Sequence, residues 1–98
     1  MSARRRWLVA YDVRDEVRLR RIHDIVRSHG DRLQYSVFLC DLTSTEKLNL
    51  KSELRCVLNQ HEGSVVFIDL GEPDRPGSAA IEFMGTSLPM PTKGPTIV

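Results

Sequence analysis

The chain has 98 residues, of which 41% are hydrophobic and 28% charged, and a net charge of +1, values typical of one globular domain with a modest core. No apolar run approaches the roughly 20 residues that span a bilayer, and the basic start MSARRRW lacks a following signal-peptide core, so we expect a cytoplasmic protein. The two cysteines, Cys40 and Cys56, are too few and too far apart for a disulfide framework or a CxxC metal knuckle, and we expect reduced thiols in the core.

The first elements predicted are a buried strand and an amphipathic helix. Residues 6–13, RWLVAYDV, are rich in aromatic and β-branched types, which favours a strand. Residues 14–30 change to helical spacing, with Asp15 and Glu16 in the first turn, where the helix dipole favours anions, and Gly30 as the stop signal. The apolar face of this helix comprises Leu19, Ile22, Ile25, Val26 and His29.

Positive charge is concentrated in the first third of the chain. Residues 1–32 hold nine arginines and five acidic residues, a balance of +4, whereas residues 33–98 have a balance of −3. Guanidinium groups match phosphate oxygens, so this asymmetry is consistent with nucleic-acid contact. The alternative is a solvated helix face with no ligand.

The middle of the chain repeats the strand and helix patterns. Residues 31–42, DRLQYSVFLCDL, are strand-like, and we expect a tight turn or bulge at 34–36 to divide them into two strands. Residues 43–46, TSTE, predict a capping box with Thr43 as N-cap and Glu46 at N3, followed by a helix that ends at 62–63. The apolar face of this second helix comprises Leu50, Leu54, Val57, Leu58 and His61.

The last third predicts strands and a proline-containing tail. Residues 64–71, SVVFIDLG, read as a strand, and residues 79–85, AAIEFMG, as a shorter one. We therefore expect a domain over residues 1–85 and a tail over residues 86–98. The tail ends in three β-forming residues, so we expect its end to add as a strand to a dimer or to a partner.

This order of elements, βαββαβ with an extra C-terminal strand, predicts an α+β fold of the ferredoxin-like class. The expected sheet is antiparallel, with both helices on one face. Strands such as VVFI carry apolar residues on both faces, so the other face also needs a cover. A second copy of the same sheet in a twofold homodimer is the simplest one.

Most motifs of catalysis are absent from the sequence. It contains no Walker A loop, GxGxxG, HExxH or GxSxG. The three histidines lack ligand spacing, and we interpret them as residues at the surface or the edge of the core. Any hydrolysis would then need a metal.

Asp12 is the exception, because an ionised carboxylate at the end of an apolar strand is costly unless it is paired, hydrogen-bonded or metal-bound. One interpretation is structural: Asp12 ends the strand and caps the next helix. The other is a ligand for a hard cation such as Mg²⁺, with a twofold axis bringing two copies of Asp12 together. Nearby arginines, Arg18, Arg20, Arg21 and Arg32, would then hold a nucleic-acid backbone.

Three motifs at this spacing carry a family resemblance. They are YDV at the end of the first strand, RLRRI in the helix, and GDRLQYSVFLCDL beyond it; IEFMG and the final IV fit as well. Together they closely resemble the CRISPR-associated protein Cas-two family over about residues 7–98. The resemblance implies a ferredoxin-like homodimer in which two first-strand aspartates face each other.

The resemblance also implies a function. In that family the aspartate that matches Asp12 binds a divalent metal, Mg²⁺ or Mn²⁺, and hydrolyses phosphodiester bonds of single-stranded RNA or double-stranded DNA. One Asp12 from each protomer would therefore be both catalytic residue and metal ligand. The residues matching family positions near the site, expected to bind nucleic acid, are Tyr11, Arg20, Arg21, Arg32, Ser36 and Phe38.

Two other functions are weighed against the nuclease. The resemblance implies a structural role in spacer acquisition, in which the dimer bridges the Cas-one integrase and holds DNA without cutting it. An RNA-recognition module is the third possibility, but no RNP-type pattern surrounds the strand aromatics Phe38 and Phe67.

Overall fold

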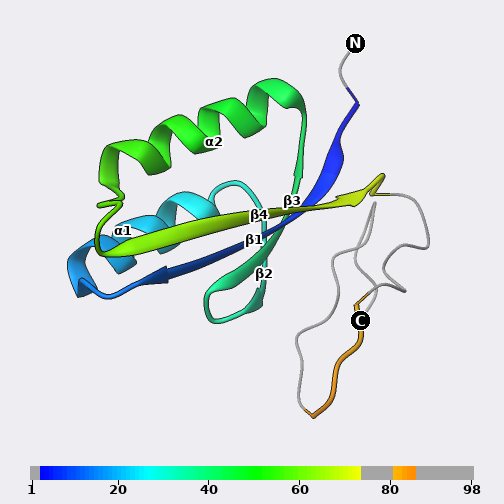
Figure 1. Ribbon diagram of the computed structural model, residues 1–98. Helices are drawn as coiled ribbons and strands as arrows, with labels where there is room; N and C mark the ends of the chain where they lie inside the picture. The colour runs from blue at the N-terminus through cyan, green and yellow to red at the C-terminus, as the bar shows by residue number, and fades with distance from the viewer. Residues whose placement is uncertain (1–2, 74–80, 86–98) are drawn as a thin grey trace.

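A computed structural model describes residues 3–73 and 81–85 of the chain (Figure 1). The strands are β1 (Arg5–Val13), β2 (Asp31–Gln34), β3 (Val37–Leu42) and β4 (Gly63–Gly71), and the helices are α1 (Glu16–Arg27) and α2 (Ser44–Val57). Their order along the chain is β1, α1, β2, β3, α2, β4. This is the predicted βαββαβ order, and the predicted ferredoxin-like fold class is confirmed.

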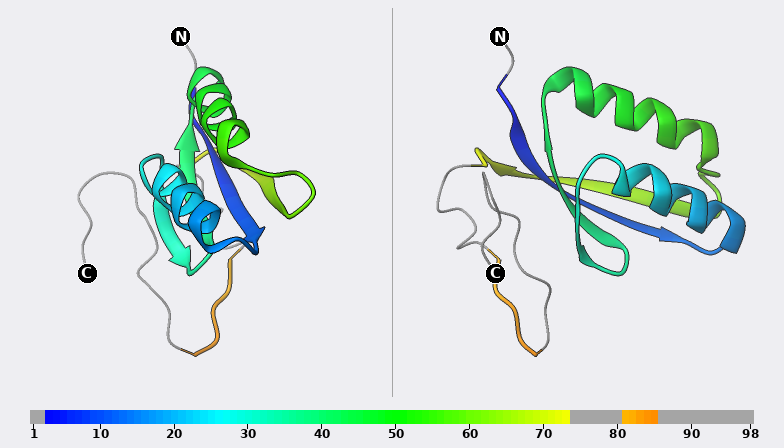
Figure 2. Two further views of the ribbon diagram at one scale, coloured as in Figure 1. Left: turned by 90° about the vertical axis from the view of Figure 1, so that its left-hand side faces the viewer. Right: turned by 180° about the vertical axis from the view of Figure 1, so that it is seen from behind.

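The four strands form one antiparallel sheet in the order β2-β3-β1-β4. Strands β1 and β3 are central, and β2 and β4 are the edges. The two views of Figure 2 show α1 and α2 on the same face of this sheet, as predicted. The two helices also contact each other, so together they form a second layer.

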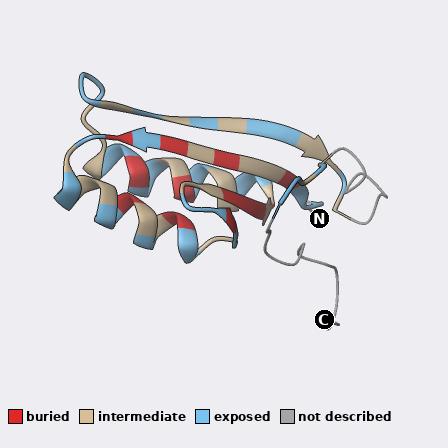
Figure 3. Cartoon of the chain, turned by 90° about the horizontal axis from the view of Figure 1, so that it is seen from below, coloured by how far each residue is buried: buried red, intermediate tan, exposed pale blue. Residues whose placement is uncertain are grey.

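The hydrophobic core lies between the sheet and the helices. Alternation along β1 directs Val9, Tyr11 and Val13 toward the helices, and all three are buried. Figure 3 shows these buried positions alternating with exposed or intermediate ones along the strand. The helices contribute four buried residues to the same cluster: Ile22, Val26, Leu50 and Leu54. Each such aliphatic side chain contributes roughly 1.5–3 kcal/mol when it leaves water.

Side-chain caps begin both helices. Asp15 is the N-cap of α1, and its carboxylate accepts a hydrogen bond from the backbone N–H of Arg18 at 2.8 Å. Because Asp15 fills this position, the capping interpretation of Asp12 is wrong. At α2 the predicted capping box is confirmed, with bonds of 3.1 Å and 2.8 Å between Thr43 and Glu46. No helix in the described residues is long and apolar enough to cross a membrane.

Three element boundaries can be compared with the sequence. The expected turn within 34–36 is confirmed, because β2 ends at Gln34 and β3 begins at Val37. Helix α2 ends at Val57 rather than at 62–63, because the side chain of Asn59 accepts a hydrogen bond from the N–H of His61 and so competes with helical bonding. Residues 81–85 are not in a strand, so the strand predicted over 79–85 is wrong there; the remainder of 79–85 and the tail 86–98 lie outside the described residues. Cys40 is buried as predicted, but Cys56 is exposed on α2, so its predicted place in the core is wrong.

The sheet face opposite the helices, called the open face below, carries apolar side chains. Two rows of paired residues cross β3, β1 and β4: Leu39–Leu8–Ile68 and Val37–Ala10–Val66. No helix of the described residues lies on this face (Figure 2). Val66 and Ile68 are 48% and 47% exposed. Leu39, on β3, is only 2% exposed, so the exposed apolar side chains of these rows include Val66 and Ile68 of β4.

Candidate functional site

Asp12 lies near the end of β1, on the open face. It pairs in register with Ser64 of β4, one row beyond the apolar pair of Ala10 and Val66. Its side chain is exposed and makes no hydrogen bond or ion pair with any described residue. The carboxylate of Asp12 is therefore available to a group from outside the chain.

A metal site needs more oxygen ligands than Asp12 alone provides. Among the described residues, no group of three or more His, Cys, Asp or Glu side chains could hold a metal ion. Asp12 of one chain does not therefore make a metal site by itself.

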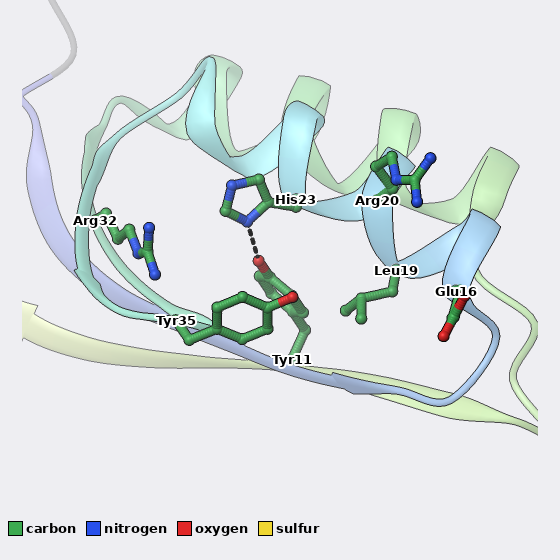
Figure 4. A pocket seen from close by; sticks show the side chains of 7 residues that line it. All are labelled: Tyr11, Glu16, Leu19, Arg20, His23, Arg32 and Tyr35. Atoms are coloured by element: carbon green, nitrogen blue, oxygen red, sulfur yellow. Dashed lines mark hydrogen bonds between the residues drawn. The ribbon is translucent and has the colours of Figure 1, made fainter.

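Tyr11, the neighbour of Asp12, points the other way. Its side chain lies under α1 and is 5% exposed, and its hydroxyl shares a hydrogen bond of 2.8 Å with Nδ1 of His23 (Figure 4). Burial raises the pKa of the Tyr11 hydroxyl, and nearby Tyr35 adds to the increase. Tyr11 therefore keeps its proton at neutral pH, and its hydroxyl can donate a hydrogen bond to Nδ1 of His23.

A recess of about 370 Å³ opens beside this pair, between α1 and the β2–β3 turn. Arg20 and Arg32 line it, and neither forms an ion pair with a described residue. The ring of Tyr35, which is 65% exposed, also lines it, with the Arg32 guanidinium 5.5 Å from the ring centroid. The recess thus combines positive charge with aromatic surface, which suits a ligand that has both a phosphate and a base.

Arg18 and Arg21, the other two arginines expected to bind nucleic acid, do not line this recess. Arg18 lies 3.2 Å from the carboxylate of Glu62 and 4.0 Å from that of Asp15, so its charge is largely matched within the chain. Arg21 is exposed on α1. The expected set of arginines is thereby divided between the recess, an internal ion pair and the free surface of the helix.

Ser36 and Phe38 contact residues that line the recess. The backbone carbonyl of Ser36 accepts a hydrogen bond from the N–H of Tyr11 at 3.1 Å. Phe38 is fully buried, and its ring lies 6.3 Å from Tyr11 and 5.4 Å from His23 between centroids. With no exposed surface of its own, Phe38 holds the Tyr11 and His23 rings in place rather than presenting a surface to a ligand.

Sequence reasoning missed His23 and Tyr35. His23 is partly buried, which agrees with the predicted place at the edge of the core, but its bond to Tyr11 and its place in the recess were not predicted. A signal was present, because Glu16, Arg20 and His23 are spaced i, i+4 and i+7 on one helical face. Tyr35 lies in the turn after β2, where no periodicity predicts which way a side chain points.

The basic N-terminal segment is partly neutralised by the fold. Arg4 bonds to Glu46 at 2.9 Å, Arg5 to Asp69 at 3.0 Å and Arg6 to Asp41 at 2.8 Å. These pairs join Arg4, which precedes β1, to α2, and join β1 to β4 and β3. The charge excess of the first third is therefore partly matched within the chain, whereas Arg20, Arg21 and Arg32 are exposed and have no ion pair with a described residue.

Comparisons with known proteins agree on one family. The family model described as CRISPR associated protein Cas2 matches residues 5–75. The chain is 30% identical over 84 residues to the CRISPR-associated endoribonuclease Cas2 1 of Rhodospirillum rubrum, covering 86% of this chain and 81% of that one. It is 34% identical over 64 residues to the CRISPR-associated endoribonuclease Cas2 3 of Synechocystis sp., covering 65% and 70%.

Solved structures similar to this chain include a Cas2 protein. The crystal structure of Cas2 from Streptococcus pyogenes superposes with a TM-score of 0.72 at 30% identity, covering 82% of this chain and 99% of that one. The crystal structure of the hypothetical protein TT1823 from Thermus thermophilus gives a TM-score of 0.75 at 26% identity, covering 90% and 98%.

Proposed function

This chain belongs to the CRISPR-associated protein Cas2 family, and we propose that it is a metal-dependent endonuclease that hydrolyses phosphodiester bonds of single-stranded RNA or double-stranded DNA. The carrying observation is Asp12, an exposed carboxylate beside the apolar rows of the open face that has no hydrogen bond or ion pair with any described residue. The relatives named above as endoribonucleases support the activity class.

The proposed enzyme is a homodimer in which two open faces pack together. Leu8, Val66 and Ile68 belong to apolar rows that lose contact with water when covered. In a twofold dimer the same surface of both chains forms the interface, so equivalent residues lie symmetrically about the axis. Asp12 lies one row beyond the apolar contact, so the two carboxylates would meet at its border.

Asp12 from each protomer would hold one Mg²⁺ or Mn²⁺ ion. Carboxylate oxygens are the protein ligands that these hard cations prefer, and Mg²⁺ keeps several waters when protein ligands are few. The bound ion would supply an activated water and neutralise charge on the phosphate. Exposed arginines of α1, such as Arg21, would contact the backbone and align the strand, giving affinity without sequence preference.

The test is magnesium-dependent cleavage of single-stranded RNA and of duplex DNA by purified dimer, wild type against Asp12→Asn. We expect the substitution to abolish cleavage while the circular dichroism spectrum stays unchanged. Asp24→Asn, which alters an exposed carboxylate on α1, serves as the matched control. Cleavage by Asp12→Asn at the wild-type rate would contradict the proposal and would indicate a contaminating nuclease.

A second candidate function is a DNA-holding dimer that binds the Cas-one integrase during spacer acquisition and cuts nothing. One observation favours it: among the described residues of the chain, no group of three or more His, Cys, Asp or Glu side chains could hold a metal ion. In that role the exposed arginines matter more than Asp12. Acquisition with Cas-one should then survive Asp12→Asn and fail in Arg21→Ala.

The tail gives a separate test of this second candidate. Removing residues 95–98, which lie outside the described residues, should weaken the dimer or its complex with the Cas-one integrase on gel filtration. An unchanged complex would argue against a structural role for the tail.

A further inference from the structure

The recess beside Tyr11 is separate from the proposed metal site. Asp12 lies on the open face of the sheet, whereas the recess lies on the helix face, between α1 and the β2–β3 turn. A group bound in the recess therefore cannot reach Asp12 of the same chain through the sheet. Whatever the recess binds, its role differs from holding a catalytic ion.

The hydrogen bond from Tyr11 determines what His23 offers to a ligand. Tyr11 keeps its proton, and we assign its hydroxyl as the donor to Nδ1 of His23, an assignment that sets the tautomer of the imidazole. A neutral imidazole that accepts at Nδ1 carries its proton on Nε2. The free nitrogen of His23 is therefore a hydrogen-bond donor, and donors suit a phosphate oxygen.

The charges around the recess favour the same ligand. Arg20 and Arg32 are two cations without a carboxylate partner in the described residues. Glu16 is the acidic residue that lines the recess, and Figure 4 shows it at the end away from Arg32. An anion is thus favoured at the end formed by Arg32 and His23.

The recess also contains a surface for a flat ring. The Tyr35 ring is 65% exposed and lies 6.3 Å from the His23 ring between centroids, with 28° between the planes. Leu19 adds an apolar wall. Stacking on an exposed tyrosine accepts any base, because every base has a π-face. A volume of about 370 Å³ lies within the range of small-ligand sites.

We infer that this recess binds one unpaired nucleotide, with its phosphate held by Arg32 and by Nε2–H of His23 and its base stacked on Tyr35. The inference rests on the proposed function and deepens it, since it names single-stranded nucleic acid as the form that the helix face recognises. Arg20 lies across the recess and adds positive charge. A free nucleoside monophosphate has the same chemistry, and the experiment below separates the two sources.

The test measures the affinity of the intact protein for three probes: AMP, a single-stranded oligoadenylate of four residues, and inorganic phosphate. We expect the tetranucleotide to bind more tightly than AMP, and AMP more tightly than phosphate. Tyr35→Ala should weaken binding of AMP and of the tetranucleotide by roughly 5- to 150-fold, the usual range for loss of one stacking contact. Tyr35 is exposed, so this variant should fold normally, as a thermal melt will check.

Two further variants test the phosphate end of the recess. Arg32→Gln should weaken the binding of all three probes. His23→Gln, which keeps a side-chain N–H donor, should bind the probes more tightly than His23→Leu. If AMP binds more tightly than the tetranucleotide, the inference that single-stranded nucleic acid is the ligand is overturned. Inorganic phosphate binding as tightly as AMP, or wild-type affinity in Tyr35→Ala, would overturn the nucleotide site itself.

Asp12→Asn separates this inference from the proposed function. It should bind all probes like the wild type while losing cleavage. If it still cleaves and the recess variants still lose affinity, the nuclease proposal fails and the recess stands. If the wild type cleaves and the recess variants bind normally, the recess inference alone fails.

Discussion

Tyr11 and Asp12 are consecutive in the chain, yet their side chains leave β1 on opposite faces of the sheet. Tyr11 is buried against α1 and bonds to His23, whereas Asp12 is exposed on the face without helices. The alternation of a strand makes this unavoidable. A motif that reads as one unit in the sequence therefore serves two separate surfaces.

The Tyr11–His23 bond predicts a difference between two conservative substitutions. Tyr11→Phe leaves Nδ1 of His23 without its partner in a partly buried position, so we expect the free energy of unfolding to fall by about 1–3 kcal/mol. Tyr35→Phe removes a hydroxyl from an exposed ring and should change stability by less than about 0.5 kcal/mol. Urea denaturation of both variants checks this; equal stabilities would contradict it.

The open face predicts a dimer that one charge can disrupt. Ile68→Asp places a carboxylate in the apolar row shared with Leu8, where a second copy would have to bury it. We expect this variant to run as a monomer in light scattering behind gel filtration. Leu48→Asp is the matched control, because Leu48 is also an exposed apolar residue but lies on α2. If Ile68→Asp and Leu48→Asp both have the same molecular mass in solution as the wild type, this interface is ruled out.

Gly30 predicts a position that tolerates no side chain. A Cβ atom there would overlap Sγ of Cys40 and the backbone carbonyl of Leu39. Both belong to the central strand β3, which cannot move without disturbing the core, so we expect Gly30→Ala to cost about 1–3 kcal/mol. Asp31→Ala alters the exposed next residue and should be nearly neutral. The melting temperatures of the two variants will differ if the packing is as described.

Glu46 predicts a pH dependence at the start of α2. The backbone N–H of Thr43, followed by the guanidinium of Arg4, lowers the pKa of the Glu46 carboxyl below its usual 4.5. A lowered folded-state pKa means that the charged form stabilises the fold above pH 4.5 and that this contribution is lost as the pH falls through the folded value.

The measurement is urea stability of wild type and Glu46→Gln between pH 3 and pH 6. The wild type should lose more stability on acidification than the variant, and Glu72→Gln should follow the wild type. Parallel curves for wild type and Glu46→Gln would show that the capping bond does not depend on the charge of Glu46.

Much of the fold followed from local patterns. The strand expected at residues 6–13 and the capping box of Thr43 and Glu46 depend on residue types close together in the chain, and both were predicted correctly. The exact end of α2 was not, because Asn59 bonds its own backbone segment and stops the helix early. A side chain that competes with the helix for backbone hydrogen bonds acts locally, but the spacing of apolar residues does not reveal this competition.

The candidate site divides along the same line. From the sequence alone one could place Asp12 at a strand end, find arginine-rich helical spacing and recognise the family motifs, since each depends on residue type and separation. Only the tertiary structure decided that Asp12 is exposed on the open face while Tyr11 lies with His23, Arg32 and Tyr35 on the other. Those contacts join β1, α1 and the β2–β3 turn, and which side chains meet depends on how the helix packs across the sheet.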